Sequence, residues 1–430
     1  MAGWLVRGTE QTWSRAAVLV CVLSAALVPA ATGAQTDSTR AQGTAAKSSA
    51  RPAVELYGRI IADYIYDFNQ NDPRWFDVVR PSKLPAFEDE FGRDGRMHFS
   101  VRQTFFGVRP QWSSPLGEVR GVFQFDLFGD GTGRTGLDLV KAYAELGKFG
   151  AGQFDSPFMD IDVFPNILEY WGPASILFFR NIQFRYMPIQ GRSRVTVALE
   201  RGAASGDRGD FDDHLELDNI IGRYPWPTLS AEGRLGRAWG YVELAGILRG
   251  IYWDDNRFPN DRLDLDGRAL GWGLSLSSNV KTTQRDVLKF QVFYGEAISS
   301  YSGAPFDIGI RVDPFDDIRP FEGAALPLFG ALAFYDHFWS DKFSTSLGYS
   351  RLDVHNSDGQ SLLAFGAGDY ALINLLYNPA ENVQVGGEFQ WARRQNAFDD
   401  FESHDFRLQF SARYRWSYTI GRDLAADGGK

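Results

Sequence analysis

Residues 406–418 read Phe-Arg-Leu-Gln-Phe-Ser-Ala-Arg-Tyr-Arg-Trp-Ser-Tyr, and hydrophobic and polar side chains alternate without interruption along this stretch. Successive side chains of a β-strand point to opposite faces of the sheet. One face of such a strand would be aromatic and aliphatic, and the other would carry Arg407, Arg413 and Arg415. Three arginines on one face do not suit a soluble core. The pattern indicates a strand that separates lipid from water.

The same alternation recurs along the chain in segments of about ten residues, which is the length that a tilted membrane strand needs. Sixteen segments follow it: 54–66, 97–109, 118–128, 137–147, 150–155, 176–186, 194–200, 228–235, 239–251, 269–277, 287–296, 323–337, 343–352, 369–377, 383–393 and 404–418. The connections between them alternate in length, from short ones such as 378–382 to long ones such as 201–227. Short periplasmic turns, long outer loops and an even strand count are typical of outer-membrane barrels. We therefore predict an all-β fold, a transmembrane antiparallel β-barrel of 16 strands.

The first residues have the features of a secretory signal peptide. Arg7 and Arg15 precede or border the apolar run 16–27, and small residues follow it. We expect four regions: a signal peptide over 1–34, a flexible periplasmic leader over 35–52, the barrel over 53–420 and a C-terminal tail over 421–430. Export together with the barrel pattern predicts the outer membrane of a Gram-negative-type bacterium, with outer-membrane lipid and lipopolysaccharide as surroundings.

Composition narrows the possible functions. Without Arg7, Arg15 and Glu10 of the signal peptide, the formal charge changes from −10 to −11, which argues against nucleic-acid binding. The single cysteine, Cys21, lies in the signal peptide, so the exported chain would have no disulfide and no thiolate metal site. Aromatic residues make up 15% of the chain, which also contains 45 glycines. This combination fits an outer-membrane barrel.

Residues 152–186 interrupt the strand pattern with a long connection that is too apolar for a loop in water. It contains Phe158, Met159, Ile161, Val163, Phe164, Ile167, Leu168, Tyr170 and Trp171. Loops are normally polar and lie on the surface. We therefore expect this connection to fold into the barrel, to pack on its wall and to form a constriction.

The quoted residues of this region also carry a family resemblance. The run from Gly152 to Pro173, with Ser156-Pro157-Phe158-Met159-Asp160 and Glu169-Tyr170-Trp171-Gly172, followed by 180–186, resembles the DcaP-like family of outer-membrane porins. The resemblance is densest over 54–190. It implies a homotrimer of sixteen-stranded barrels that pass small anionic solutes such as dicarboxylates. Some family members have an N-terminal coiled coil, whereas residues 35–52 have no heptad pattern.

Several charged residues are candidates for the pore lining and the constriction. The cationic candidates are Arg59, Arg102, Arg120, Lys141, Arg180, Arg185, Arg407 and Arg413, and the acidic candidates in or near the folded-in connection are Asp155, Asp160, Asp162 and Glu169. Rows of arginine and lysine stabilise anions as they lose water, so we expect part of this set to form a cationic ladder. The alternative is that these charges form cross-strand ion pairs.

The predicted outer loops are rich in aspartate, as in 207–218 and 254–266. Carboxylates could bind divalent cations, but no EF-hand spacing is present, and solvated loops are the preferred interpretation. An acidic mouth would oppose the entry of anions, which is in tension with a cationic wall. We predict neither a metal site nor a cofactor.

Two other classes of function remain as alternatives. An enzyme, such as a barrel-embedded lipase, would need a nucleophile system, and none of the five histidines has a Ser, Asp or Glu pattern that forms one. We therefore predict that the chain is not an enzyme. A non-conducting barrel that serves as an adhesin or structural anchor is the second alternative, and liposome swelling would distinguish it from a porin.

Overall fold

A computed structural model describes residues 52–129, 133–256 and 262–421. The predicted signal peptide 1–34, nearly all of the predicted leader 35–52 and residues 422–430 of the predicted tail lie outside the described residues. Among the residues that are described, no helix is long and apolar enough to cross a membrane.

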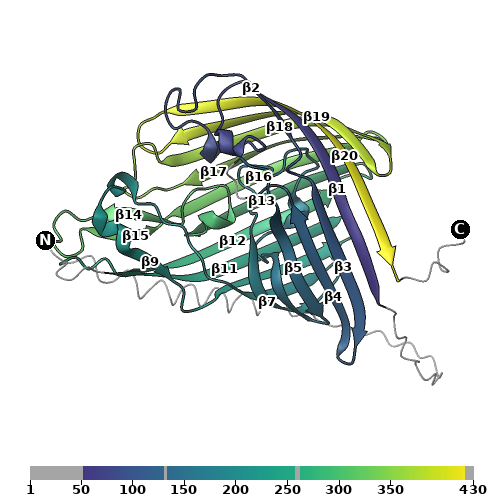
Figure 1. Cartoon of the computed structure of the whole chain (residues 1–430), viewed down its shortest axis with the longest axis horizontal. Helices are drawn as coiled ribbons and strands as arrows, with labels where there is room; N and C mark the ends of the chain where they lie inside the picture. The colour runs from purple at the N-terminus through teal and green to yellow at the C-terminus, as the bar shows by residue number, and fades with distance from the viewer. Residues whose placement is uncertain (1–51, 130–132, 257–261, 422–430) are drawn as a thin grey trace, which may run out of the picture. The chain divides into compact units, whose positions relative to one another are not determined.

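The described chain forms a closed antiparallel β-barrel of 16 strands, which confirms the predicted fold (Figure 1). Each barrel strand pairs with the next in the sequence, and the last strand pairs with the first. This closing pair joins β20 (Glu402–Ile420) to β1 (Ala53–Asp67), in register from Val54 opposite Ile420 to Asp67 opposite Arg407. The alternating stretch 406–418 is thus the strand that closes the barrel, so that no strand edge faces lipid.

The remaining barrel strands follow the expected segments closely. They are β3 (Phe105–Ser114), β4 (Gly117–Asp126), β5 (Asp138–Leu146), β6 (Phe149–Asp155), β7 (Arg180–Ile189), β8 (Arg194–Glu200), β10 (Thr228–Arg237), β11 (Gly240–Asp255), β12 (Gly267–Lys281), β13 (Asp286–Glu296), β16 (Pro327–Phe338), β17 (Phe343–Val354), β18 (Phe365–Ala380) and β19 (Val383–Asn396). Two short strands, β2 (Arg96–Ser100) and β9 (Ile220–Arg223), extend β3 and β10 along the partners β1 and β11.

The structure differs from the expected segments at three places. The expected strand 97–109 is interrupted at 101–104, where Arg102 turns into the interior. The expected strand 176–186 begins only at Arg180, because Ile176 and Leu177 are buried against the inner wall and belong to the folded-in connection. The expected strand 323–337 is two elements: β15 (Phe321–Ala325) leaves the barrel and pairs with β14 (Ile308–Val312) as a separate hairpin.

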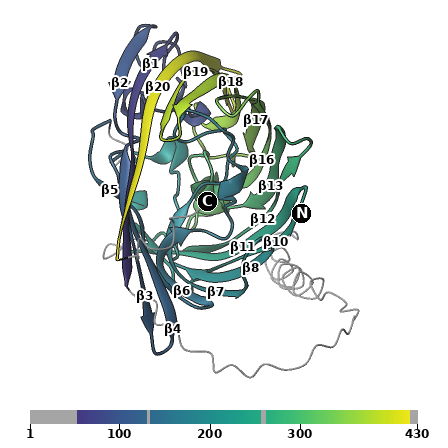
Figure 2. The same ribbon diagram turned by 90° about the vertical axis from the view of Figure 1, so that its right-hand side faces the viewer.

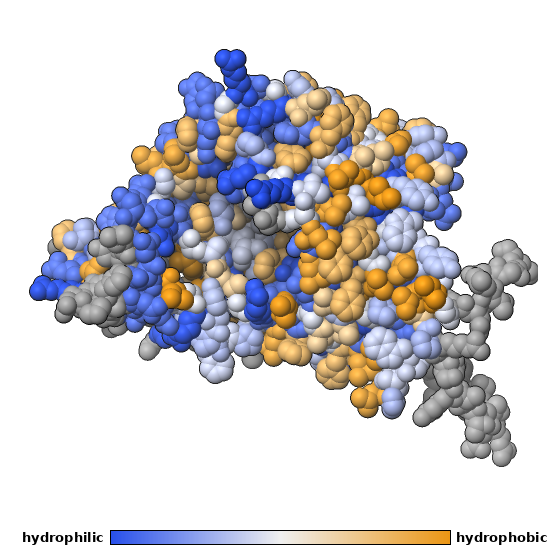
Figure 3. All heavy atoms as spheres, in the orientation of Figure 1, coloured by the Kyte–Doolittle hydropathy of each residue, from blue (hydrophilic) through white to orange (hydrophobic). Residues whose placement is uncertain are grey.

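The connections contain only short 3₁₀ helices within the described residues. These are η1 (Pro73–Trp75), η2 (Pro81–Lys83), η3 (Ile161–Val163), η4 (Gly209–Phe211), η5 (Leu215–Asn219) and η6 (Ser299–Tyr301). The long connections lie at one end of the barrel, together with β9, β14 and β15, whereas β1 begins and β20 ends at the opposite end (Figure 1). Side chains at the long-connection end are mostly hydrophilic, and hydrophobic side chains gather over the outer face of the barrel (Figure 3).

The core of this barrel lies inside it. Two clusters of buried hydrophobic residues join the inner wall to the folded-in connections, and they contain, among others, Phe158, Leu177, Phe293 and Leu328 in one cluster and Val79, Val163, Ile176 and Phe334 in the other. Figure 2 looks into the barrel from the end where β1 begins and shows chain segments within the ring of strands. The inward faces of the strands therefore divide into a part that packs on these segments and a part that does not.

Candidate functional site

Residues 156–179, between β6 and β7, form the inward-folded segment. Phe158, Leu168 and Leu177 in this segment are fully buried, although the segment has almost no regular structure. Phe158 and Leu177 pack on inward side chains of the strands from β11 to β18, such as Phe293 and Leu328. Burial of apolar surface drives this packing, which confirms the expected inward-folded loop.

The inner wall also satisfies the backbone of this segment. The Leu168 backbone N–H donates to Glu388 Oε2 at 2.8 Å, and the Ala174 N–H donates to Ser350 Oγ at 2.9 Å. The Leu168 carbonyl accepts from the Gln103 amide at 3.1 Å and from the Arg413 guanidinium. Buried irregular backbone needs partners of this kind, so the polar inward residues hold the segment against the wall.

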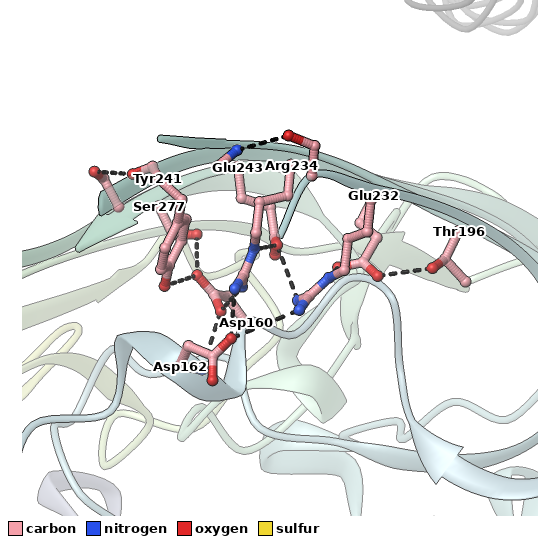
Figure 4. A network of polar contacts seen from close by, with 12 residues as sticks. Asp160, Asp162, Thr196, Glu232, Arg234, Tyr241, Glu243 and Ser277 are labelled. Carbon is pink, nitrogen blue, oxygen red and sulfur yellow. Dashed lines mark hydrogen bonds and ion pairs between the residues drawn. The ribbon is translucent and has the colours of Figure 1, made fainter. Parts of the chain in front are cut away.

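An ionic network anchors the segment at η3 (Figure 4). Arg234 on β10 donates to Asp160 at 2.5 Å and also pairs with Asp162. Asp160 accepts two further hydrogen bonds, from Tyr241 at 2.7 Å and from Ser277 at 2.6 Å. The predicted constriction residues Asp160 and Asp162 therefore lie together, and wall arginines neutralise them.

We call the buried inward side chains of β8, β10–β13 and β16–β19 the covered wall. Its polar members include Glu200, Ser230, Gln291, Asp336 and Glu388, each no more than 2% exposed. Most hold the inward-folded segment directly, as the Asp336 carboxylate does by accepting from the Asn166 N–H at 3.3 Å. The covered wall is thus a support for the segment.

We call the inward, water-accessible side chains on the opposite side the open wall. They are Arg59 on β1, Arg109 on β3, Arg120 on β4, Lys141, Tyr143 and Glu145 on β5, Arg185 on β7 and Arg415 on β20. All of these are exposed or half-buried. Gly150 on β6 leaves the room that Arg185 uses, since a Cβ there would lie 3.0 Å from the Arg185 Cγ. The segment does not cover these residues.

Four of the predicted cationic residues lie on the open wall. The Arg59 guanidinium stacks over the Phe105 ring at 5.1 Å, and the Arg185 guanidinium stacks over the Phe154 ring at 3.7 Å. Lys141 pairs with Asp155 at 2.5 Å, and Arg120 pairs with Glu118 at 2.8 Å. Among the described residues, neither Arg59 nor Arg185 has a carboxylate within ion-pair distance.

Three other predicted arginines are enclosed. Arg102 pairs with Asp77 beneath the connection after β1, and Arg407 pairs with Asp67 at 2.5 Å on the closing strand pair. Both arginines are no more than 1% exposed. Arg413 is 8% exposed and donates to the Leu168 carbonyl and to the Ile167 carbonyl at 3.1 Å. The structure gives these three a place in holding the fold together.

The last two predicted residues, Arg180 and Glu169, differ in their surroundings: Arg180 lies next to the open wall, and Glu169 contacts the connection after β1. Arg180 lies 3.4 Å from Asp155 and 4.5 Å from the Phe178 ring, next to the open wall. Glu169 accepts from the backbone N–H groups of Val79, at 3.3 Å, and Gly172. Burial raises the pKa of Glu169 to about 8, since a charged carboxylate is poorly solvated there.

Sequence reasoning missed a second inward-folded connection, residues 68–95. Val78, Val79 and Leu84 are no more than 1% exposed, and Ser82 Oγ donates to the Gly303 carbonyl at 2.7 Å. The apolar residues in this otherwise polar connection were the available signal. It also missed Arg234 and the buried pair of Arg249 with Asp307 at 3.1 Å, because nothing local marks such partners.

No group of three or more His, Cys, Asp or Glu side chains is arranged to hold a metal ion in the part of the chain that the structure describes. The acidic outer loops instead contain ion pairs: Arg208 with Asp218 at 2.6 Å, Arg223 with Asp254 at 2.7 Å and Arg319 with Asp264 at 2.6 Å.

Comparison with solved structures gives the same architecture. The outer membrane channel DcaP of Acinetobacter baumannii superimposes with a TM-score of 0.69 at 18% identity, over 87% of this chain and 99% of that one. An anion-selective porin from Comamonas acidovorans gives a TM-score of 0.54 at 9% identity, over 85% and 100%. OmpT of Vibrio cholerae, folded in vitro, gives 0.51 at 12% identity, over 86% and 99%. At these identities the likeness concerns the fold.

The sequence was also compared with families and with curated proteins. No curated protein sequence matches the chain. The family model described as "DcaP outer membrane protein" matches residues 33–307, which is more than half of the chain. This match confirms the resemblance of the region around 152–186, and the chain belongs to the DcaP outer membrane protein family.

Proposed function

We propose that this protein is a porin: a water-filled channel through which small anionic solutes, such as dicarboxylates, diffuse passively. The observation that carries the proposal is the charge of the open wall, where Arg59 and Arg185 have no ion-pair partner among the described residues. Arg415, opposite Arg59 in the register of β1 and β20, adds a third unpaired guanidinium of this kind. Unpaired cations beside water stabilise an anion that loses part of its hydration shell.

The acidic residues of the inward-folded segment do not cancel this charge. Asp160 and Asp162 face Arg234 and Arg194 on the covered wall, away from the open wall. Glu169 is buried under backbone N–H groups. Asp155, the last residue of β6 next to the segment, does lie beside the open wall, and it is matched by Lys141 and Arg180. The balance of charge along the uncovered side of the lumen is therefore positive.

The net negative charge of the outer loops, which would oppose the entry of anions, is smaller than the loop composition indicates. Arginines of the same loops pair with Asp218, Asp254 and Asp264, so part of the negative charge is neutralised locally. At physiological ionic strength, salt also screens the interaction of an exposed charge with any ion that is more than about 8 Å away. This supports solvated, partly paired outer loops.

We further propose the homotrimer that the family resemblance implies. The outward faces of β4, β5 and β6 bring small residues together, because Gly121, Ala144 and Ala151 lie in register across the three strands. Small side chains allow the close approach of a second barrel in lipid. Native mass spectrometry in detergent tests this assembly, and a monomer at all protein concentrations would contradict it.

The proposed selectivity is tested by the reversal potential of single channels in a KCl gradient. We expect the wild type to be anion-selective, and Arg59→Gln and Arg185→Gln each to shift the reversal potential toward cation selectivity. Arg407→Gln is not a usable comparison because that arginine is buried, so Arg120→Gln, whose charge is paired, is the matched control. Absence of conductance, or cation selectivity of the wild type, would overturn the proposal.

A further inference from the structure

The connection 68–95 carries two cations that the fold does not pair. Arg80 precedes the 3₁₀ helix η2 and Lys83 is its last residue, and no carboxylate of the described residues lies within ion-pair distance of either. Both side chains are half-buried. The Arg80 Nη2 donates to the Ser302 carbonyl at 3.3 Å, whereas its Nε is buried without a hydrogen-bond partner. A guanidinium in this state retains unused capacity to bind an anion.

Tryptophan rings frame these cations. The Arg80 guanidinium lies 4.6 Å from the Trp171 ring and 5.2 Å from the Trp75 ring, and the Lys83 ammonium lies 5.5 Å from the Trp75 ring. The two indoles meet edge to face at 5.7 Å. Trp75 belongs to the connection 68–95 and Trp171 to the inward-folded segment, so the cluster lies where the two inward-folded parts meet.

The backbone under these cations is held firmly. Arg394 on β19 donates to the Ser82 carbonyl at 3.2 Å, and Ser82 Oγ donates to the Gly303 carbonyl. Pro81 packs closely on Gly368 of β18. A Cβ added to Gly368 would lie only 2.4 Å from the Pro81 Cβ. A binding group on such a support is positioned before the ligand arrives, which lowers the entropy cost of binding.

The cluster connects to the open wall through aromatic contacts. Trp171 lies 5.6 Å from Phe178, and Phe178 lies under the Arg180 guanidinium at 4.5 Å. Arg180 in turn shares Asp155 with Lys141. Cations therefore follow one another from the connection 68–95 toward the lumen, with tryptophan and phenylalanine rings between them.

We propose that Arg80 and Lys83 form an entry site that binds the carboxylate group of a small organic anion at the long-connection end of the channel, before the anion reaches the open wall. This site rests on the anion channel proposed above and gives it a direction-dependent first step. The guanidinium and the ammonium bind the carboxylate, and the faces of Trp75 and Trp171 exclude water from one side of it. Burial lowers the pKa of Arg80 to about 10, which still leaves it charged at neutral pH.

A purely structural role is the competing explanation, in which Arg80 and Lys83 only hold Trp75 and Trp171 together. Cation–π contacts with tryptophan do stabilise folds. The two explanations differ in what they predict for a ligand added from one side of the membrane, because a structural defect changes the channel for ligands from both sides.

The test uses oriented single channels of the full-length protein in a planar bilayer, with succinate added to either side. For the wild type we expect brief interruptions of the chloride current. In Arg80→Gln and in Lys83→Gln we expect the association rate of succinate from the long-connection side to fall about tenfold. The association rate from the opposite side stays unchanged, and Arg80→Lys recovers most of the lost rate.

Equal rates in the wild type and both glutamine variants would overturn the entry site, and so would an equal loss from both sides. Lys83→Gln keeps the test valid if Arg80→Gln does not fold, since the hydrogen bond that Lys83 donates, to the Arg80 carbonyl at 2.8 Å, comes from its backbone N–H and is kept in the variant. The reversal potential of the same channels separates this result from the failure of the proposed function. A wild type that is anion-selective with unaltered variants contradicts the entry site alone, and a cation-selective wild type contradicts both.

Discussion

The two inner walls of this barrel are built from strands of the same pattern and yet have opposite roles. On the covered wall, Glu388 and Arg234 are buried and bind the inward-folded segment. On the open wall, Arg59 and Arg185 are accessible to water and bind no carboxylate among the described residues. The comparison shows that an inward charge in this barrel stays accessible to water only where no second layer of chain covers it. Variants on the two walls should therefore separate stability from selectivity.

The largest effect is expected for Arg234→Met on the covered wall. The change leaves Asp160 and Glu243 buried with one counter-charge fewer, and breaking a buried pair in this way costs about 3–5 kcal/mol of unfolding free energy. Urea unfolding in detergent or lipid measures it. We also expect larger current noise, because η3 loses its anchor. An unfolding free energy equal to that of the wild type would contradict the anchoring role.

A smaller loss is expected for Leu177→Ala, which opens a cavity between the inward-folded segment and the covered wall. Leu177 is fully buried, and such truncations cost about 2–5 kcal/mol. The matched control is Leu199→Ala on β8, whose side chain faces outward and is 49% exposed. The control leaves no internal cavity, so we expect it to be less destabilising. A reversed order would mean that the segment does not pack as described.

The contact between the segment and the connection 68–95 should depend on pH through Glu169. Its pKa is raised to about 8 by burial, so the folded protein binds this proton more tightly than the unfolded chain. Stability from this group is therefore greatest in acid and falls as the pH rises through about 8, by at most about 1.4 kcal/mol per pH unit. We expect more frequent channel closures at pH 9 than at pH 6. Glu169→Gln should abolish this dependence, and a persisting dependence would assign it to another group.

The smallest effect is expected for Arg120→Gln on the open wall. The Arg120 side chain is 64% exposed, and its pair with Glu118 is screened by water, so we expect less than about 1 kcal/mol of lost stability. The thermal unfolding midpoint and the reversal potential should both stay close to those of the wild type. A loss of stability as large as that of Arg234→Met would contradict the different roles of the two walls.

Much of the architecture could be predicted because its signals are local. Alternation of period two identified the barrel strands, and the match of β1 with β20 followed from closure. The inward-folded segment was predictable because Phe158, Val163 and Leu168 are too apolar for a loop in water. The breaks at 101–104 and before Arg180 were not predictable, since they depend on what those residues contact inside the barrel.

The partners of the charged residues could not be predicted in the same way. The alternation along each strand predicts that Arg407 and Arg185 both face inward. It does not predict that Arg407 pairs with Asp67 or that Arg185 has no ion-pair partner among the described residues. The partner of Arg234 lies in a segment whose path depends on packing. The second inward-folded connection, with Arg80, was missed for a different reason, because its few apolar residues stand among polar ones.

The sequence alone is enough to predict that residues 406–418 separate lipid from water, that strands of this kind recur, and that one connection is too apolar to stay outside. These properties follow from the order of neighbouring residues. Which arginines are neutralised and which face water became visible only in the folded chain. This difference depends on strand register and on the path of the inward-folded segments, which join residues hundreds of positions apart, and an unpaired charge is defined only once all its neighbours are in place.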